Sequence, residues 1–323
     1  MKDTMTLEAM QTYRGRQELP EDFDSFWEKN IASLPETIFH VVEEKDFNTP
    51  NIRCIDLYFN GTNKGNVYVR CVFPKVDQKV PVIFHFHGYM GQSPDWSVLF
   101  SYAALGYGVV AMDVRGQSGR SLDNATFNGN TVKGQIIRGM VDGPDHLFYK
   151  DVYLDVYSLI EIVSQFEEVD ENRLFSYGGS QGGALALVAA ALNPKIQKCV
   201  TVYPFLGDFK RVLELGNHSE AYDELFRYFK FHDPFHQTEE DILNTLSYID
   251  IKNFSHLISC PVKFVTCLDD NVCFPSTQYA IYNRLTTEKE HLLLPEYGHD
   301  AVNVQLNDTI FNWLTGSEIT FEF

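Results

Sequence analysis

The stretch LFSYGGSQGGALAL, residues 174–187, carries the pattern that decides the fold. Four residues with β character run into a glycine-flanked serine, and an alanine- and leucine-rich helical run follows at once. The motif Gly-x-Ser-x-Gly, formed by Gly178, Ser180 and Gly182, therefore falls on a sharp turn between a strand and a helix. Glycines leave room for such a turn and for close helix packing, and the N-terminus of the helix favours negative charge beside the serine. The stretch predicts a nucleophile elbow with Ser180 as the nucleophile.

The segments on either side of the elbow alternate between strands and helices. Predicted strands with nearly continuous apolar runs cover residues 80–86, 108–114, 199–203, 262–267 and 291–294, and predicted helices cover 93–105, 149–166 and 302–314. This alternation is typical of a parallel sheet with helices on both faces, whose functional sites lie beyond the carboxyl ends of the strands. The alternating runs at 52–59 and 66–73 predict an antiparallel hairpin at a sheet edge.

We expect residues 1–323 to form one α/β domain. Residues 1–45 are polar and helical in places, and we describe them as an N-terminal helical extension. Residues 205–257 interrupt the alternation with charged helical segments that are rich in aromatic residues. This pattern predicts a helical insertion over the site.

The composition excludes several classes of function. The net charge of −18 disfavours binding to nucleic acid and to anionic membranes. No apolar run approaches the roughly 20 residues that span a bilayer, and the N-terminus lacks the apolar core of a secretory signal. The six cysteines form no Cys-x-x-Cys pair, which disfavours a zinc site or a redox pair. We therefore expect a cytoplasmic protein with reduced thiols.

A serine hydroxyl needs a base, and the base needs a carboxylate that orients it. In folds with this elbow, the acid and then the histidine follow the serine along the chain. Asp269 and Asp270 end one predicted strand, and His299 follows the next strand after a glycine. We expect His299 to be the base, whereas periodicity does not choose between the two aspartates.

The oxyanion of an acyl-transfer reaction needs preorganised N–H donors. One donor is the backbone N–H of Gln181, directly after the nucleophile. The loop at residues 86–91 follows an early strand and offers the N–H of Tyr89 or a neighbour. His85 and His87 in this region form a His-x-His pair, but no third ligand has a usable spacing. We therefore expect no metal and no cofactor.

These residues resemble the carbohydrate esterase family that contains acetyl xylan esterases and cephalosporin C deacetylases. The resemblance covers nearly the whole chain, and its specific motifs are Phe-His-Gly-Tyr at 86–89, Val-Arg-Gly-Gln at 114–117, Gly-Gly-Ser-Gln-Gly-Gly at 178–183, Pro-Ser-Thr at 275–277 and Gly-His at 298–299. The resemblance implies an α/β-hydrolase fold with a catalytic triad of Ser180, Asp270 and His299. It also implies oxyanion donors at Tyr89 and Gln181, with the tyrosine ring bordering a small acyl pocket. By the same resemblance, Arg115 and Gln117 are structural braces.

The resemblance implies a serine esterase that removes acetyl groups from small soluble esters, such as acetylated xylo-oligosaccharides and cephalosporin C-type acetates. It also implies a homohexamer. Three positions depart from the family pattern and affect the expected pocket rim, namely Cys267, Phe274 and Asp300. The alternatives are a broad carboxylesterase or peptidase of the same fold, and a hydrolase-fold binding protein without turnover. The intact triad argues against the binding protein, and the short segment before the first core strand argues against the peptidase.

Overall fold

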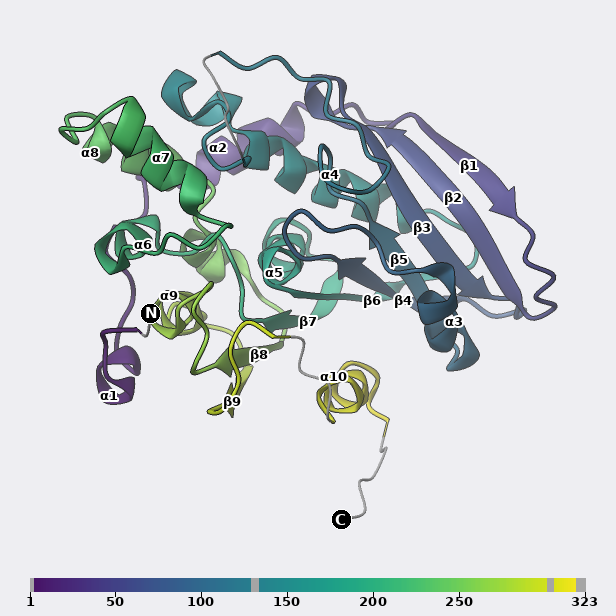
Figure 1. Cartoon of the computed structure of the whole chain (residues 1–323). Coiled ribbons are helices and arrows are strands. Elements are labelled where there is room, and N and C mark those ends of the chain that lie inside the picture. Colours follow the sequence, from purple (N-terminus) through teal and green to yellow (C-terminus); the bar gives the residue numbers. More distant parts are fainter. Residues whose placement is uncertain (1–2, 129–133, 301–304, 318–323) are drawn as a thin grey trace.

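The structure, a computed structural model, describes residues 3–128, 134–300 and 305–317. Within these residues the chain forms one nine-stranded sheet in the order β1-β2-β3-β5-β4-β6-β7-β8-β9 (Figure 1). The strands are β1 (His40–Lys45), β2 (Ile52–Asn60), β3 (Asn66–Pro74), β4 (Val80–Phe86), β5 (Gly108–Met112), β6 (Val169–Gly179), β7 (Ile196–Val202), β8 (Val262–Cys267) and β9 (Lys289–Leu294). All neighbours from β5 to β9 are parallel, and β1, β2 and β3 join them as antiparallel strands. The predicted fold class, a mostly parallel sheet in an α/β fold, is confirmed.

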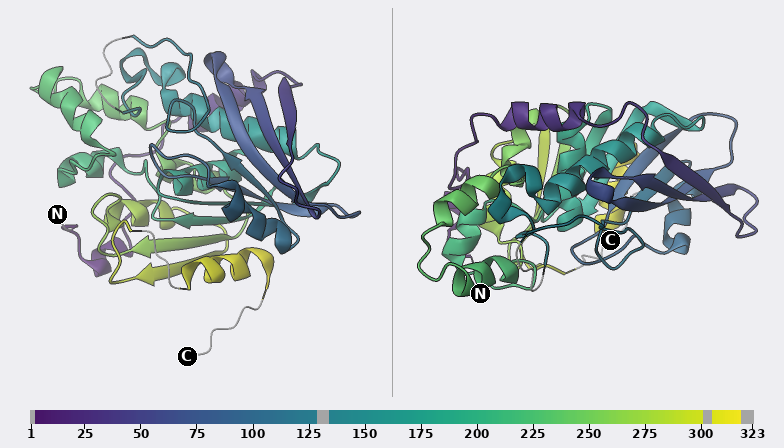
Figure 2. Two further views of the ribbon diagram at one scale, coloured as in Figure 1. Left: turned by 45° about the vertical axis from the view of Figure 1, so that its right-hand side comes forward. Right: turned by 90° about the horizontal axis from the view of Figure 1, so that it is seen from above.

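Helices cover both faces of this sheet, as Figures 1 and 2 show. The α-helices are α1 (Leu7–Met10), α2 (Phe23–Ala32), α3 (Trp96–Ala104), α4 (Phe148–Val163), α5 (Gln181–Leu192), α6 (Phe209–Leu215), α7 (Asp223–Phe231), α8 (Glu239–Leu246), α9 (Pro275–Tyr282) and α10 (Leu306–Thr315). Short 3₁₀ helices occur at η1 (Thr62–Lys64), η2 (Met140–Asp142), η3 (Pro144–His146), η4 (Ile251–Asn253) and η5 (Ser255–Leu257). The predicted helix over 302–314 corresponds to α10, and its residues 302–304 lie outside the described residues.

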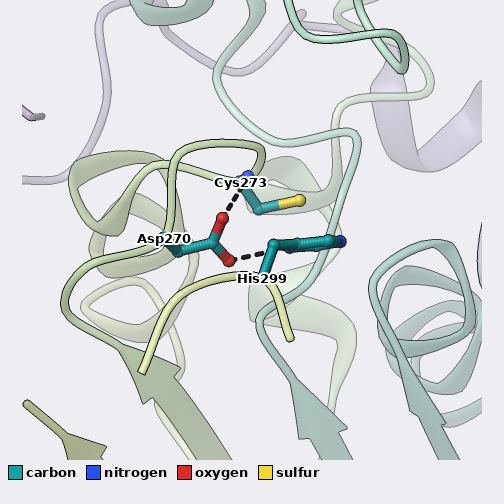
Figure 3. Close-up of side chains that lie close together, drawn as sticks. All are labelled: Asp270, Cys273 and His299. Carbon is teal, nitrogen blue, oxygen red and sulfur yellow. Dashed lines mark hydrogen bonds and ion pairs between the residues drawn. The ribbon is translucent and has the colours of Figure 1, made fainter. Parts of the chain in front are cut away.

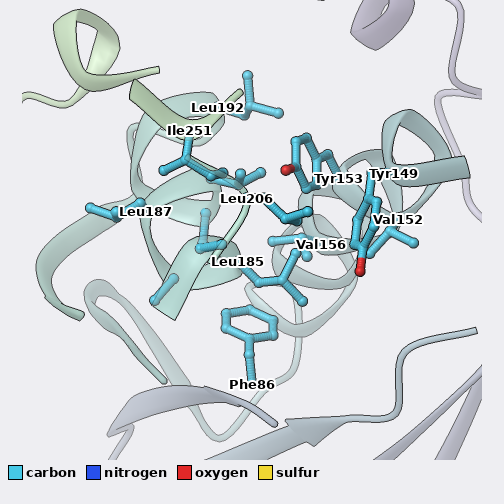
Figure 4. Close-up of a cluster of buried hydrophobic side chains, with 14 of the residues drawn as sticks. Phe86, Tyr149, Val152, Tyr153, Val156, Leu185, Leu187, Leu192, Leu206 and Ile251 are labelled. Carbon is cyan, nitrogen blue, oxygen red and sulfur yellow. The ribbon is translucent and has the colours of Figure 1, made fainter. Parts of the chain in front are cut away.

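The larger core lies between the sheet and helices α2, α4 and α5. Figure 4 shows its centre, where Phe86 of β4 and Leu185 of α5 meet aliphatic and aromatic side chains of α4. Helix α4 is buried along almost its whole length because it packs against α5, while its Tyr153 also contacts Trp27 of α2 and Phe254 of the insertion. A second cluster packs Leu306, Ile310 and Leu314 of α10 against the opposite face of the sheet. Burial on both faces explains why the central strands β4 and β5 are almost entirely apolar.

The antiparallel edge differs from its prediction in one respect. The hairpin of β2 and β3 forms as expected, but the outermost strand is β1, which pairs with β2 from His40 opposite Phe59 to Lys45 opposite Cys54. Residues 40–45 belong to the N-terminal segment that we described as helical in places. Their strand has no apolar–polar alternation in burial, because most of its side chains are exposed. An edge strand of this kind has no hydrophobic period that would reveal it in the sequence.

The segment between β7 and β8 contains α6, α7, α8, η4 and η5. It is tied to the body of the protein by hydrogen bonds from Trp27 Nε1 to the Tyr248 carbonyl, at 3.1 Å, and from the Tyr153 hydroxyl to the Ile249 carbonyl, at 2.9 Å. In Figure 1 its helices α6 to α8 lie at the end of the sheet toward which β6 and β7 run. In the described parts of the chain, no helix is both long and apolar enough to cross a membrane.

Candidate active site

Ser180 stands at the end of β6 in a strained backbone conformation. Its φ of 57° and ψ of −119° are unusual for a residue with a side chain, and helix α5 begins at the next residue. The turn is anchored to β7 because Ser180 N donates to the Val202 carbonyl at 2.9 Å and the Ser180 carbonyl accepts from Phe205 N at 3.0 Å. This geometry holds the serine at the carboxyl edge of the parallel sheet, where strain marks functional positions.

The glycines beside the serine are required by close backbone approach. A Cβ added at Gly182 would lie 1.9 Å from the carbonyl oxygen of Phe86, and one added at Gly178 would lie 2.3 Å from the backbone of Gly182. Strand β4, the elbow and helix α5 therefore approach one another more closely than any side chain allows.

The structure brings Ser180, His299 and Asp270 together in one hydrogen-bonded chain. His299 Nε2 lies 3.0 Å from Ser180 Oγ, and His299 Nδ1 lies 2.9 Å from Asp270 Oδ2. The carboxylate comes from the loop after β8 and the imidazole from the loop after β9. With Nδ1 protonated toward the carboxylate, Nε2 presents its lone pair to the serine hydroxyl. This arrangement suits proton transfer from the serine.

Asp270 is fixed on both of its oxygens. Figure 3 shows its carboxylate between the backbone nitrogen of Cys273 and the imidazole of His299. Oδ1 accepts from the amides of Val272 and Cys273 at 2.8 and 2.9 Å. Asp270 is buried, whereas the neighbouring Asp269 is exposed. Of the two aspartates that the sequence left open, Asp270 is the one that is hydrogen-bonded to the imidazole.

The imidazole also contacts a residue that the sequence analysis missed. The ring of Tyr203, directly after β7, lies 4.7 Å from the imidazole centroid, and its hydroxyl donates to the Asp300 carbonyl at 3.4 Å. Tyr203 adopts a φ of 35°. Its place directly after a central parallel strand was the available signal, since such positions converge on the site.

The two expected oxyanion residues lie on either side of the elbow. Tyr89 is in the loop after β4, and Gln181 is the first residue of α5. Among the described residues, no hydrogen bond joins either backbone N–H to a protein acceptor. The Gln181 side chain exchanges hydrogen bonds with the Gln117 amide at 2.7 and 3.0 Å and accepts from the Tyr149 hydroxyl at 2.9 Å.

The hydrogen bonds of Arg115 go to residues other than the serine. Arg115 is buried and forms a two-point contact with Asp155 of α4, at 2.7 and 2.6 Å, and donates to the Thr62 carbonyl at 2.8 Å. Burial raises the pKa of Asp155 to about 6, and the arginine opposes that rise. These contacts join the segment after β5 to α4 and η1, which is a bracing position.

Two groups of side chains near the site contain atoms that can bind metals. His87 Nδ1 donates to the Gly88 carbonyl at 2.8 Å, and His87 Nε2 accepts from the Val114 amide at 2.9 Å, so the ring has no lone pair left for an ion. The donor atoms of Asp270, Cys273 and His299 lie within 4.8 Å of one another (Figure 3). Asp270 and His299 already pair with each other, however, and burial raises the pKa of the Cys273 thiol well above its ordinary value. The group therefore fits proton transfer better than metal binding.

Known proteins resemble this chain in both sequence and structure. Residues 1–317 match the family model for acetyl xylan esterase, AXE1. The chain belongs to the acetyl xylan esterase family. A crystal structure of acetyl xylan esterase 1 from Thermoanaerobacterium sp. shares 38% sequence identity with a TM-score of 0.93, covering 96% of this chain and 98% of that one. An acetyl xylan esterase from Paenibacillus sp. R4 shares 33% identity with a TM-score of 0.91, covering 97% and 99%.

A curated relative is acetyl esterase Axe7A of Xylanibacter ruminicola, which is 30% identical over 305 residues. The match covers 91% of this chain and 66% of the relative. These matches agree with the α/β-hydrolase fold, and the family is one of carboxylic ester hydrolases.

Proposed function

We propose that the chain is a metal-independent serine esterase that removes acetyl groups from small soluble acetyl esters through an acetyl-enzyme. Its substrates would include acetylated xylo-oligosaccharides and cephalosporin C-type acetates. The observation that carries the proposal is the hydrogen-bonded chain from Ser180 through His299 to Asp270. Family membership supports the acetyl group as the acyl part.

In this proposal Ser180 Oγ attacks the carbonyl carbon of the acetyl ester while His299 Nε2 takes the hydroxyl proton. Asp270 stabilises the imidazolium that forms, and the N–H groups of Tyr89 and Gln181 receive the oxyanion. The tetrahedral intermediate collapses when Nε2 returns the proton to the leaving alcohol. Water, activated by the same nitrogen, then hydrolyses the acetyl-enzyme.

The acyl pocket would be small because aromatic side chains crowd it. The ring of Tyr89 lies 5.4 Å from that of Phe205, which in turn lies 4.6 Å from Tyr222. Both Phe205 and Tyr222 are buried and belong to the region after β7. A longer acyl chain would have to displace this packed set.

The test is hydrolysis of p-nitrophenyl acetate, butyrate and octanoate by the wild type and by Ser180→Ala. Acetate-selective turnover that disappears in the variant is the expected result. Preference for octanoate would keep a serine hydrolase but contradict the acetyl esterase. Equal, negligible rates for both proteins would favour a binding protein.

We further propose a homohexamer in the cytoplasm, as the family resemblance implies. All six cysteines are free and buried, which suits a reducing compartment. Light scattering tests the assembly, and the mass of a single chain would contradict it.

A further inference from the structure

The insertion contributes a buried acid to the surroundings of the oxyanion site. Glu224 lies in the first turn of α7 and is only 2% exposed. Its carboxylate accepts hydrogen bonds from three consecutive amides, those of Gln135 at 2.7 Å, Ile136 at 2.9 Å and Ile137 at 3.3 Å. A buried carboxylate is costly unless it is hydrogen-bonded, so this arrangement fixes residues 135–137 firmly onto α7.

The backbone before this segment is shaped to receive the carboxylate. Gly134 has a φ of 85°, and a Cβ added there would lie 2.1 Å from Glu224 Oε1. Burial raises the pKa of Glu224 to about 7, and the three amide hydrogen bonds oppose that rise. The carboxylate is therefore surrounded by backbone N–H groups, and it leaves no room for a side chain at position 134.

Glu224 reaches the first oxyanion residue directly. The Tyr89 hydroxyl donates to Glu224 Oε1 at 3.3 Å, while the Tyr89 ring packs against Phe205. The tyrosine is thus held at its hydroxyl by the insertion and along its ring by the segment after β7. A side chain held at both places limits the positions that its backbone N–H adopts.

Glu224 reaches the second oxyanion residue through a chain of amides. Gln135, whose backbone N–H binds the carboxylate, accepts from Gln117 Nε2 at 2.6 Å and donates to the Gly116 carbonyl at 2.9 Å. Gln117 in turn pairs with the side chain of Gln181. The side chains of both residues that are expected to donate to the oxyanion are therefore linked by hydrogen bonds to one carboxylate.

We propose that Glu224 is a positioning residue of the oxyanion site, which acts through Tyr89 on one side and through Gln135, Gln117 and Gln181 on the other. This inference rests on the proposed esterase function. The helical insertion is then part of the catalytic architecture and not merely a cover. Glu224 does not contact Ser180 or His299 and takes no part in proton transfer.

The test compares Glu224→Gln with the wild type on p-nitrophenyl acetate. A glutamine keeps the size of the side chain but places an NH₂ group against at least one of the three N–H donors, so we expect the 135–137 segment to shift. We expect kcat to fall by about 10- to 100-fold with KM changed by less than about threefold, because misplaced oxyanion donors affect the transition state and not substrate binding. The rate at which a fluorophosphonate labels Ser180 should fall with kcat.

The matched control is Asp233→Asn, also in the insertion. Asp233 is buried and accepts from the amides of Gln237 and Thr238 at 2.9 and 2.8 Å, but it lies outside the network described above. Asp233→Asn should lower the melting temperature without changing kcat or the labelling rate. A folded Glu224→Gln protein with wild-type kcat and labelling rate would overturn the proposal.

If Glu224→Gln does not fold, Tyr89→Phe and Gln135→Ala test the two routes separately. A fall in kcat in either variant supports the route that it interrupts, and wild-type kcat in both overturns the proposal. Inactivity of the wild type on every acetate ester would instead contradict the esterase. The labelling rate would still compare the positioning of Ser180 in the variants.

Discussion

Asp270 and Glu224 are two buried carboxylates that come from differently built regions. Each accepts hydrogen bonds from successive backbone amides, and each has one further contact that points toward the chemistry. Asp270 belongs to a loop at the carboxyl edge of the sheet and faces the imidazole directly. Glu224 belongs to the insertion and faces the oxyanion residues through a phenol and an amide chain. In the proposed mechanism, the sheet edge supplies the reacting groups and the insertion positions the residues around them.

The largest predicted effect is a loss of kcat caused by a substitution at the sheet edge. Asp270→Asn should lower kcat by about 10⁴-fold, because an asparagine favours the wrong imidazole tautomer and does not stabilise the imidazolium. Steady-state hydrolysis of p-nitrophenyl acetate measures the effect. The matched control is Asp269→Asn at the adjacent exposed position, which should retain nearly all activity. Equal losses in the two variants would contradict the assignment of Asp270.

The next effect concerns the packing that the elbow requires. Gly182→Ala should destabilise the protein by roughly 3 kcal/mol or more, since its Cβ would meet the Phe86 carbonyl at 1.9 Å and move β4 away from the elbow. Gly88→Ala is the control for stability, because a Cβ there meets nothing within 4 Å. Denaturant unfolding compares the two. Equal stabilities would show that the close approach of β4 to the elbow is not needed.

The smallest effect concerns the insertion and depends on pH. The folded pKa of Glu224 is raised to about 7 from 4.5, so the folded state binds its proton more tightly than the unfolded state does. The protonated Glu224 therefore contributes to the free energy of unfolding. This contribution is present in full below about pH 4.5 and is lost as the pH rises to about 7, a change of roughly 3 kcal/mol at most. The facing phenols of Tyr89 and Tyr149 stay neutral in this range, because burial raises the pKa of each.

Unfolding of the wild type and of Glu224→Gln between pH 4.5 and pH 8 measures this contribution. The wild type should lose more stability than the variant as the pH rises. Parallel curves for the two proteins would mean that Glu224 ionises as an ordinary exposed acid.

The same two regions explain what the sequence could predict. The carboxyl ends of parallel strands meet at one edge, so strand order predicts that Ser180, His299 and one of the two adjacent aspartates lie together there. Strand order did not choose between Asp269 and Asp270, and only the family resemblance favoured Asp270. No comparable rule predicts where Glu224 lies. It lies on a helix whose position over the sheet depends on tertiary packing, and its partners at 135–137 have no regular spacing to it in the sequence. Edge strand β1 was missed for a related reason, because a strand exposed on both faces has no hydrophobic period.

The central claim is that Ser180 carries the acetyl group during turnover. The most direct measurement is intact-protein mass spectrometry after rapid acid quenching of the enzyme with excess p-nitrophenyl acetate, followed by peptide mapping. The account predicts the added mass of one acetyl group on the peptide that contains Ser180, and its absence in Ser180→Ala. An acetyl group on another residue in turnover-competent enzyme, or the same labelling in the variant, would contradict it.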